Sequence, residues 1–380
     1  MKNFYFTFLA IFALSFTIHS QTLDKLVDID GYNMHFKIMK GVGTPILFEA
    51  GGGDDSSVWT SILERIHKVT GTTLITYDRS GFGQSELNPK LKNDSDFDIE
   101  NGIKELETAL AKLGYNNEII MVSHSYGGLY NLLYANKHPK KVKSIVLIDA
   151  TLSNFWNEDF LAMRDMFVDI NTIPKGTGDY YLNFNYNEIM RSLRNTQFPE
   201  NIPVANIFPD KSAPVYPEEY ANRWKKVHVD LGNNNNNVTN IIAESSGHAI
   251  FNDNPGLIIN AIVKAYVETL DENQQNVVLQ KALDNAIDLS IKTKVHNRSE
   301  HDLNTLGYSF LQTQELDKAL DVFKTTTILF PESANAYDSY GEALLMSDKK
   351  DEAIEMYEKS VALDPNNEHG KEVLLKLKED

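Results

Sequence analysis

Residues 121–128 read Met-Val-Ser-His-Ser-Tyr-Gly-Gly, an apolar run that stops at a turn of small residues before a helical pattern begins. The apolar residues 119–122 predict a strand, and residues 126–137 predict a helix that ends before Pro139. A serine at the corner of such a strand–turn–helix takes a strained backbone conformation that lifts its hydroxyl clear of the sheet. We therefore predict that Ser125 is a nucleophile.

This turn resembles the nucleophile elbow G-x-S-x-G of the α/β-hydrolase superfamily, with Ser123 in the place of the first glycine. The resemblance covers roughly residues 28–270, and it implies an α/β fold with a mostly parallel sheet, flanking helices and a helical cap. It also implies acyl transfer to water through an acyl-enzyme, with no metal and no cofactor. Haloalkane dehalogenases and epoxide hydrolases use an aspartate nucleophile, so the serine at the corner disfavours these branches.

A glycine-rich loop follows the strand predicted at residues 45–50 and resembles the loop that supplies one oxyanion donor in the superfamily. Gly52 stands where a backbone N–H binds the oxyanion, and the N–H of Tyr126 is the second expected donor. A plain glycine-rich turn is the alternative. Asp78 and Arg79 open a segment that resembles the superfamily's D-x-x-G-x-G-x-S, and we interpret them as structural supports of the oxyanion loop.

The expected general base is His248, which follows a predicted strand and comes late in the chain, as the superfamily's order Ser, Asp, His requires. For the acid that orients this imidazole we choose Asp210, which follows the strand predicted at residues 202–208. Asp149 ends the preceding predicted strand and is the rival.

Other histidines are expected to have no catalytic role. His124 adjoins Ser125, so its side chain should point to the opposite side of the turn. His67, His228 and His301 lie in helix-like or polar contexts, and we expect them to be exposed to solvent.

Aromatic residues and methionines are frequent in residues 151–200, a segment inserted between two predicted strands where the superfamily carries its cap. Their roughly helical spacing is typical of helices packed on a body, and in a cap the same surface lines the mouth of the pocket. We expect a small-molecule acyl substrate with an apolar acyl or aryl group, and the predicted reaction is cleavage of a carboxylic ester or related acyl bond.

Two other functions fit the same residues. A proline iminopeptidase-like aminopeptidase shares the body and the triad but needs a negatively charged pocket for the substrate's amino terminus, for which Glu158 and Asp159 are candidates. The alternative from another class is a non-catalytic module that binds a ligand in the hydrolase pocket and a protein through its C-terminal part.

The N-terminal residues predict export. Lys2 precedes an apolar run, and residues 1–20 have the order of a secretory signal peptide with cleavage after Ser20. This run is too short for a transmembrane helix, so we expect a secreted or bacterial periplasmic protein without stable membrane insertion. The absence of cysteine excludes disulfides, and the formal net charge of −17 argues against nucleic-acid binding.

A chain of 380 residues is longer than the hydrolase domain expected at residues 21–270. From residue 301 two segments align with a period of 34 residues. The matched pairs include Leu303 with Tyr337, Gly307 with Gly341, Ala319 with Ala353, Phe323 with Tyr357 and Pro331 with Pro365. These segments resemble the tetratricopeptide repeat, which implies helical repeats at residues 301–334 and 335–368 and a C-terminal capping helix at residues 372–380.

Residues 271–300 join the two parts, and a degenerate half-repeat helix at about residues 274–293 is expected to dock on the hydrolase body. Tetratricopeptide repeats commonly hold peptides or proteins, so a protein or peptide partner is one expectation. A stabilising or dimerising role is the other.

Overall fold

The computed structural model describes residues 22–210, 218–285, 300–312 and 314–379. The predicted signal peptide at residues 1–20 lies outside these ranges, as does the end of the predicted half-repeat. In the part of the chain that is described, no helix is both long and apolar enough to cross a membrane.

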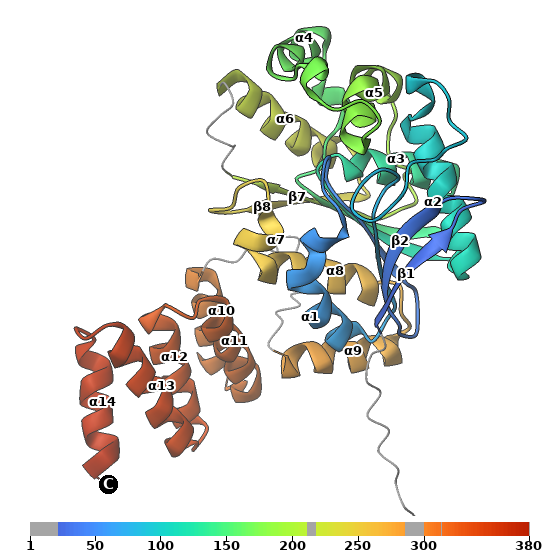
Figure 1. Cartoon of the computed structure of the whole chain (residues 1–380). Helices are drawn as coiled ribbons and strands as arrows, with labels where there is room; N and C mark the ends of the chain where they lie inside the picture. Colours follow the sequence, from blue (N-terminus) through green and yellow to red (C-terminus); the bar gives the residue numbers. More distant parts are fainter. Residues whose placement is uncertain (1–21, 211–217, 286–299, 313, 380) are drawn as a thin grey trace, which may run out of the picture.

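An eight-stranded sheet forms the centre of the larger part of the molecule (Figure 1). Its strands are β1 (Thr22–Asp28), β2 (Asn33–Met39), β3 (Ile46–Glu49), β4 (Leu74–Tyr77), β5 (Ile119–His124), β6 (Val142–Ile148), β7 (Val204–Pro209) and β8 (Val238–Ala243). Their order is β1-β2-β4-β3-β5-β6-β7-β8. The pairs β1–β2 and β2–β4 are antiparallel, and all other neighbours are parallel. This arrangement confirms the mostly parallel sheet expected from the sequence.

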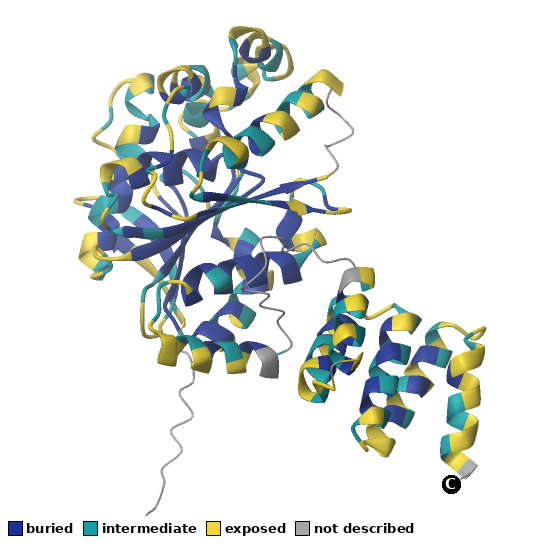
Figure 2. Ribbon diagram, turned by 180° about the vertical axis from the view of Figure 1, so that it is seen from behind, coloured by how far each residue is buried: buried dark blue, intermediate teal, exposed yellow. Residues whose placement is uncertain are grey.

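Helices cover both faces of the sheet, because parallel strands need crossover connections. One face carries α1 (Thr60–Thr70), the short α7 (Ile250–Asp253), α8 (Pro255–Val267) and α9 (Glu272–Asp284), and the other carries α2 (Ile99–Leu113), α3 (Gly127–Lys137) and α6 (Glu218–Asn234). In β5, Ile119 and Met121 belong to one apolar cluster and Ile120 and Val122 to the other, so alternate side chains fill opposite cores. Figure 2 shows the resulting band of buried residues through the sheet.

The segment between β6 and β7 is helical, as predicted for a cap. It contains α4 (Glu158–Phe167), α5 (Gly178–Leu193) and two short 3₁₀ helices, Ser153–Phe155 and Ile170–Thr172. Asn157 caps α4 by accepting from the N–H of Phe160, and Thr177 caps α5 by accepting from the N–H of Tyr180. In Figure 1, α4 and α5 lie with α6 on one side of the sheet.

In the described residues from 300 onward, five helices form the C-terminal part: α10 (Glu300–Gln312), α11 (Leu316–Leu329), α12 (Ala334–Met346), α13 (Lys350–Leu363) and α14 (Glu368–Glu379). Successive helices pack as pairs, and the same close approach recurs one period apart. A Cβ added to Gly307 would lie 2.5 Å from the Phe323 ring, and one added to Gly341 would lie 2.8 Å from the Tyr357 ring. Glycine is therefore needed at both crossings. The assignment of these pairs to the tetratricopeptide family remains a prediction.

The helix expected between the two parts corresponds to α9. Its Val278 and Ala282 are buried in the apolar cluster that α1 and α8 form, so α9 packs on the body that contains the sheet.

Candidate active site

Ser125 stands on a sharp turn between β5 and α3, as the sequence predicts. Its φ of 50° is in the left-handed region, and its N–H donates to the carbonyl of Ile148 over 3.1 Å. The following glycines are needed, because a Cβ on Gly127 would lie 2.6 Å from the carbonyl oxygen of Ala50 and one on Gly128 would lie 2.6 Å from the Cβ of Ala150. The turn therefore combines a strained serine with close backbone crossings.

His248 lies in the loop after β8 and is held by a buried carboxylate. Its Nδ1 is 2.5 Å from Oδ2 of Asp149, which directly follows β6, has a φ of 40° and is 3% exposed. Burial opposes the charged imidazole, but the hydrogen bond and the charge of Asp149 outweigh it and raise the pKa of His248 above its ordinary value. The side chain of His248 is half exposed, and it lines the same cavity as Ser125.

The choice of Asp210 as the partner of His248 is wrong in this structure. Asp210 is exposed at the end of β7, where its N–H continues the ladder to β8 by donating to the carbonyl of Ala243 over 3.1 Å. The loop that carries His248 instead reaches past β7 to the end of β6. The rival Asp149 therefore occupies the position that the sequence assigned to Asp210.

Two residues on α6 complete the surroundings of Asp149 and were not predicted. The indole N–H of Trp224 donates to Oδ1 of Asp149 over 2.7 Å. Nε2 of His228 lies 3.8 Å from the same oxygen, and its Nδ1 is 2.9 Å from Oδ1 of Asn206. Trp224 and His228 stand four residues apart, a helical spacing that places both on one face and could have indicated a shared target.

The expected solvent exposure of His228 is wrong. The residue is fully buried, and this burial lowers its pKa to about 4. His228 is therefore neutral at pH 7 and adds no positive charge beside Asp149.

His124 supports the His248 loop. Its Nε2 is 3.0 Å from the backbone carbonyl of His248, and the two rings are 4.5 Å apart between centroids. Burial lowers the pKa of His124 to about 4, so it is neutral at pH 7 and its Nε2–H donates to this carbonyl. The sequence predicts that the His124 side chain points to the opposite side of the turn from Ser125; in the structure it contacts the backbone of His248 and is not among the residues that line the cavity.

Gly52 and Tyr126, the two predicted oxyanion donors, lie together. A Cβ on Gly52 would be 3.4 Å from the Cβ of Tyr126, and both residues line the cavity with Ser125 and His248. Among the described residues, neither backbone N–H donates to an acceptor in the protein. Both donors thus remain available to a ligand in the cavity.

Arg79 supports the oxyanion loop by donating to its backbone carbonyls. Its guanidinium donates to the carbonyl of Ala50 over 3.1 Å and also to that of Gly51. It pairs with Glu49 at 3.1 Å, and burial raises the pKa of Glu49 to about 7 although Arg79 and Tyr77 oppose this shift. The buried Glu49 was not recognised in the sequence.

Asp78 anchors the start of the neighbouring loop. Its carboxylate accepts from the N–H of Ser56 over 2.8 Å and from the N–H of Gln84 over 2.9 Å, and Nδ1 of His35 is 2.8 Å away. These contacts agree with the supporting role predicted for Asp78.

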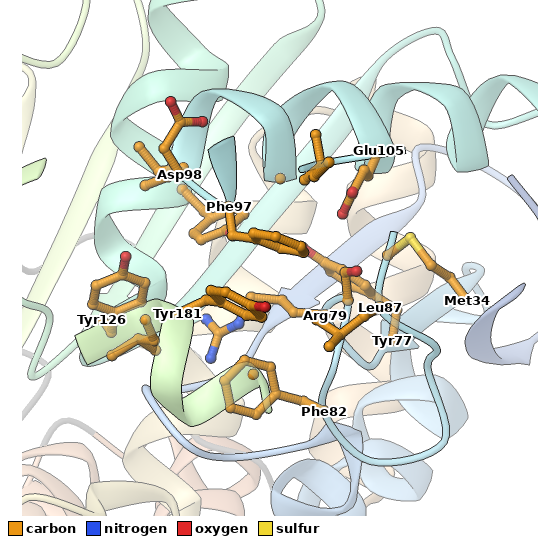
Figure 3. Close-up of a pocket in the computed structure, with 17 residues that line it drawn as sticks. Met34, Tyr77, Arg79, Phe82, Leu87, Phe97, Asp98, Glu105, Tyr126 and Tyr181 are labelled. Atoms are coloured by element: carbon orange, nitrogen blue, oxygen red, sulfur yellow. The ribbon is translucent and has the colours of Figure 1, made fainter. Parts of the chain in front are cut away.

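A small cavity of about 50 Å³ lies beside Arg79 and is distinct from the one at Ser125 (Figure 3). Arg79 lies over the ring of Phe82, and the rings of Phe97 and Tyr181 stack 3.7 Å apart at the wall of this cavity. Tyr181 belongs to α5, so the stack holds the cap to the body.

The larger cavity, of about 530 Å³, contains the candidate active site. Its floor comes from the loops that carry Gly52, Ser125, Asp149 and His248. The walls come from α4, α5 and α6, and they include Trp156, Met163, Arg164, Phe167, Asp179, Leu182, Asn183, Tyr186, Tyr220 and Trp224. The described residues contain no cluster of three or more His, Asp or Glu side chains that could hold a metal ion.

Comparison with known proteins gives one family and several distant relatives. Residues 44–187 match the family described as the alpha/beta hydrolase fold. The uncharacterised protein YqjL of Bacillus subtilis is 27% identical over 248 residues, which cover 64% of this chain and 92% of that protein. A proline iminopeptidase of Lactobacillus delbrueckii subsp. lactis is 27% identical over 177 residues, 45% of this chain and 57% of that protein. The structure of an epoxide hydrolase mutant from Vigna radiata superposes with a TM-score of 0.50 at 16% identity and covers 66% of this chain and 99% of that one.

Proposed function

Because the chain has the α/β-hydrolase fold, we propose that it is a serine hydrolase that cleaves carboxylic esters through Ser125, His248 and Asp149. The observation that carries this proposal is the convergence on one cavity of a strained serine, a carboxylate-bound histidine and two backbone N–H groups that have no acceptor among the described residues.

In the proposed reaction His248 Nε2 takes the proton of the Ser125 hydroxyl as its oxygen bonds to the ester carbonyl carbon. The N–H groups of Gly52 and Tyr126 stabilise the oxyanion, each typically by about 3–4 kcal/mol. Collapse of this intermediate breaks the ester bond, and the alcohol leaves with the proton from His248. Water then attacks the acyl-enzyme by the same steps, which releases the acid and restores Ser125.

Asp149 has two supporting roles in this reaction. Its hydrogen bond to Nδ1 keeps the other ring nitrogen of His248 free to act as base, and its charge stabilises the imidazolium that forms. The donor from Trp224 holds the second carboxylate oxygen, so the carboxylate cannot rotate away from His248.

The aminopeptidase alternative rests on the 27% identity to a proline iminopeptidase and on Asp179, an exposed carboxylate at the cavity. Glu158, the earlier candidate for binding a substrate amine, is paired with Arg191 and Arg194 at 2.9 Å each and does not line the cavity. The wall that α4, α5 and α6 form is mainly aromatic and apolar, which favours an ester with an apolar group over a free amino terminus.

The test is hydrolysis of p-nitrophenyl esters of rising acyl length, beside proline p-nitroanilide, by the purified protein and by Ser125→Ala. Turnover of the esters that disappears in Ser125→Ala supports the esterase. Turnover of the anilide alone assigns the aminopeptidase. Absence of turnover of both substrates, with no labelling by a fluorophosphonate, refutes the proposed enzymatic function and favours the non-catalytic binding module.

We also propose that residues 1–20 direct export and that α10–α14 are tetratricopeptide-type repeats, on the sequence features described above. Mass spectrometry of the mature N-terminus tests the first proposal: a protein that begins with Met1 in the producing cell contradicts it. A pull-down with the intact protein and with a variant substituted at exposed residues of α12 tests whether the repeats bind a peptide. Equal capture by the two proteins contradicts binding at α12.

A further inference from the structure

We propose that Arg164 binds a second, free carboxylate of the substrate, so that the preferred esters are monoanionic. The proposal rests on the proposed esterase function. It concerns a residue of the cap that takes no part in the bond-breaking steps.

Arg164 is a largely buried cation that lines the candidate active-site cavity. Its side chain is 12% exposed, and its guanidinium lies 3.9 Å above the ring of Tyr186. Both residues line the cavity that contains Ser125. A guanidinium over an aromatic ring can keep N–H groups free for hydrogen bonds, and its planar fork is the geometry that a carboxylate recognises.

Among the described residues, hydrogen-bond acceptors are present for only some of the N–H groups of this guanidinium. One N–H donates to Oδ1 of Asn183, and another lies 3.4 Å from Oδ1 of Asp165, an exposed neighbour that also accepts from Asn187 over 2.7 Å. These contacts use two of the five N–H donors of an arginine. Burying a cation is costly unless it is paired, so a site that leaves this one with a weak partner is prepared for an anion from outside the chain.

Other arginines of the cap show the contrast. Arg191 and Arg194 share Glu158 at 2.9 Å each and do not line the cavity. Arg191 is also 44% exposed. The outer arginines thus pair with their carboxylate at 2.9 Å, whereas the arginine that faces the cavity has its carboxylate neighbour, Asp165, at 3.4 Å.

The position of Arg164 fits a carboxylate a few bonds away from the reacting carbonyl. The guanidinium of Arg164 lies over the ring of Tyr186, and the centroid of this ring is 5.9 Å from that of the Tyr126 ring. The backbone N–H of Tyr126 is an expected oxyanion donor. Asp179, a carboxylate of the cap that lines the cavity, is exposed, and a Cβ added to Gly53 would lie 3.4 Å from its Oδ1. A substrate carboxylate at Arg164 is therefore expected to lie beside Asn183 and Tyr186, which line the same cavity.

The experiment uses two matched ester pairs, one for each side of the scissile bond. Mono-p-nitrophenyl adipate and its methyl ester differ in a carboxylate on the acyl side. 4-Acetoxybenzoate and its methyl ester differ in a carboxylate on the leaving group. Wild type, Arg164→Met, Arg164→Lys and the control Arg191→Met are compared by kcat/KM, with thermal melts for each.

We expect wild type to prefer the charged member of one pair by about 10–100-fold, the value typical of a charge-assisted hydrogen bond. Arg164→Met should lose this preference, which is read as the ratio of kcat/KM between the two members of the pair. Arg164→Lys should retain only part of it, because an ammonium does not form the planar fork. Arg191→Met should behave as wild type. Hydrolysis of both pairs without such a preference, or a preference unchanged in Arg164→Met, overturns the inference and leaves the esterase intact.

If wild type hydrolyses neither pair, the proposed esterase fails and binding decides the inference. Monomethyl adipate and dimethyl adipate are then titrated while the fluorescence of Trp156 and Trp224, which line the cavity, is recorded. Binding of the monoanion that is lost in Arg164→Met and kept in Arg191→Met supports the anion site. Equal binding of the two compounds, or none, refutes it.

Discussion

Asp149→Asn is the substitution that most directly tests the assignment of Asp149, rather than Asp210, as the acid partner of His248. The asparagine fits the site, because it is nearly isosteric and tolerates the left-handed backbone conformation that the φ of 40° requires. Its Oδ1 can still accept from Trp224, which now donates to Asp149 over 2.7 Å. Its amide NH₂ then faces Nδ1 of His248, which is 2.5 Å from the carboxylate in the native protein. An NH₂ group can only donate, so Nδ1 must become the acceptor and the ring proton moves to Nε2, the nitrogen that should act as base.

The expected cost is on the order of 10⁴ in kcat, equivalent to about 5 kcal/mol of transition-state stabilisation. The pH profile should also change. In wild type we expect the rate to rise with pH as His248 loses its proton, at a pKa that Asp149 holds above the ordinary value against the effect of burial. Removal of the negative charge should move this rise to lower pH.

The assay is the pH dependence of kcat/KM for p-nitrophenyl butyrate, with circular dichroism melts to show that the variants are folded. Asp210→Asn is the matched control, because this carboxylate is exposed at the end of β7. It should stay within about twofold of wild type. A large loss in Asp210→Asn beside a small loss in Asp149→Asn would refute the assignment.

Other perturbations test the supports of the site. Ser125→Ala should abolish ester turnover and fluorophosphonate labelling while the melting temperature stays close to that of wild type; residual turnover above background would show another nucleophile. Gly127→Ala should lower the free energy of unfolding by about 1–3 kcal/mol, because its Cβ would lie 2.6 Å from the carbonyl oxygen of Ala50, and an unchanged urea midpoint would contradict the close crossing. Buried His228, with a pKa lowered to about 4, should stay neutral in the folded chain while the unfolded chain takes up a proton below about pH 6.5, so stability should fall by up to roughly 3 kcal/mol as the pH drops to 4. Urea titrations of wild type and His228→Asn should show that this acid-dependent loss is smaller in the variant, and parallel curves would refute it.

Local patterns were sufficient to predict most of the sheet. The strands predicted at residues 45–50, 119–122 and 202–208 correspond to β3, β5 and β7 with small differences at their ends, and the helix predicted after Ser125 differs from α3 by one residue. These elements are short buried strands and a helix with clear breakers, so the residues within each one determine its conformation.

The wrong choice of Asp210 arose because local sequence patterns do not determine which strand end the His248 loop reaches. Asp149 and Asp210 both end parallel strands at the same edge of the sheet, and each looks like a suitable acid in the sequence. Only the path of the loop after β8 determines which one His248 reaches. The pairing of Glu49 with Arg79 and the burial of His228 were missed for the same reason, since their partners lie 30 and 22 or more residues away in the chain.

The sequence by itself determined the turn at Ser125, because steric limits on a few neighbouring residues are enough to form a strained corner between a strand and a helix. It also determined the order in which the candidate site residues occur along the chain, from the oxyanion loop to the late histidine. Only the tertiary structure decided which carboxylate faces His248 and which arginine of the cap faces the cavity. Those outcomes depend on how separate strands and helices approach one another, and the energies of such contacts belong to pairs of residues that no local pattern connects.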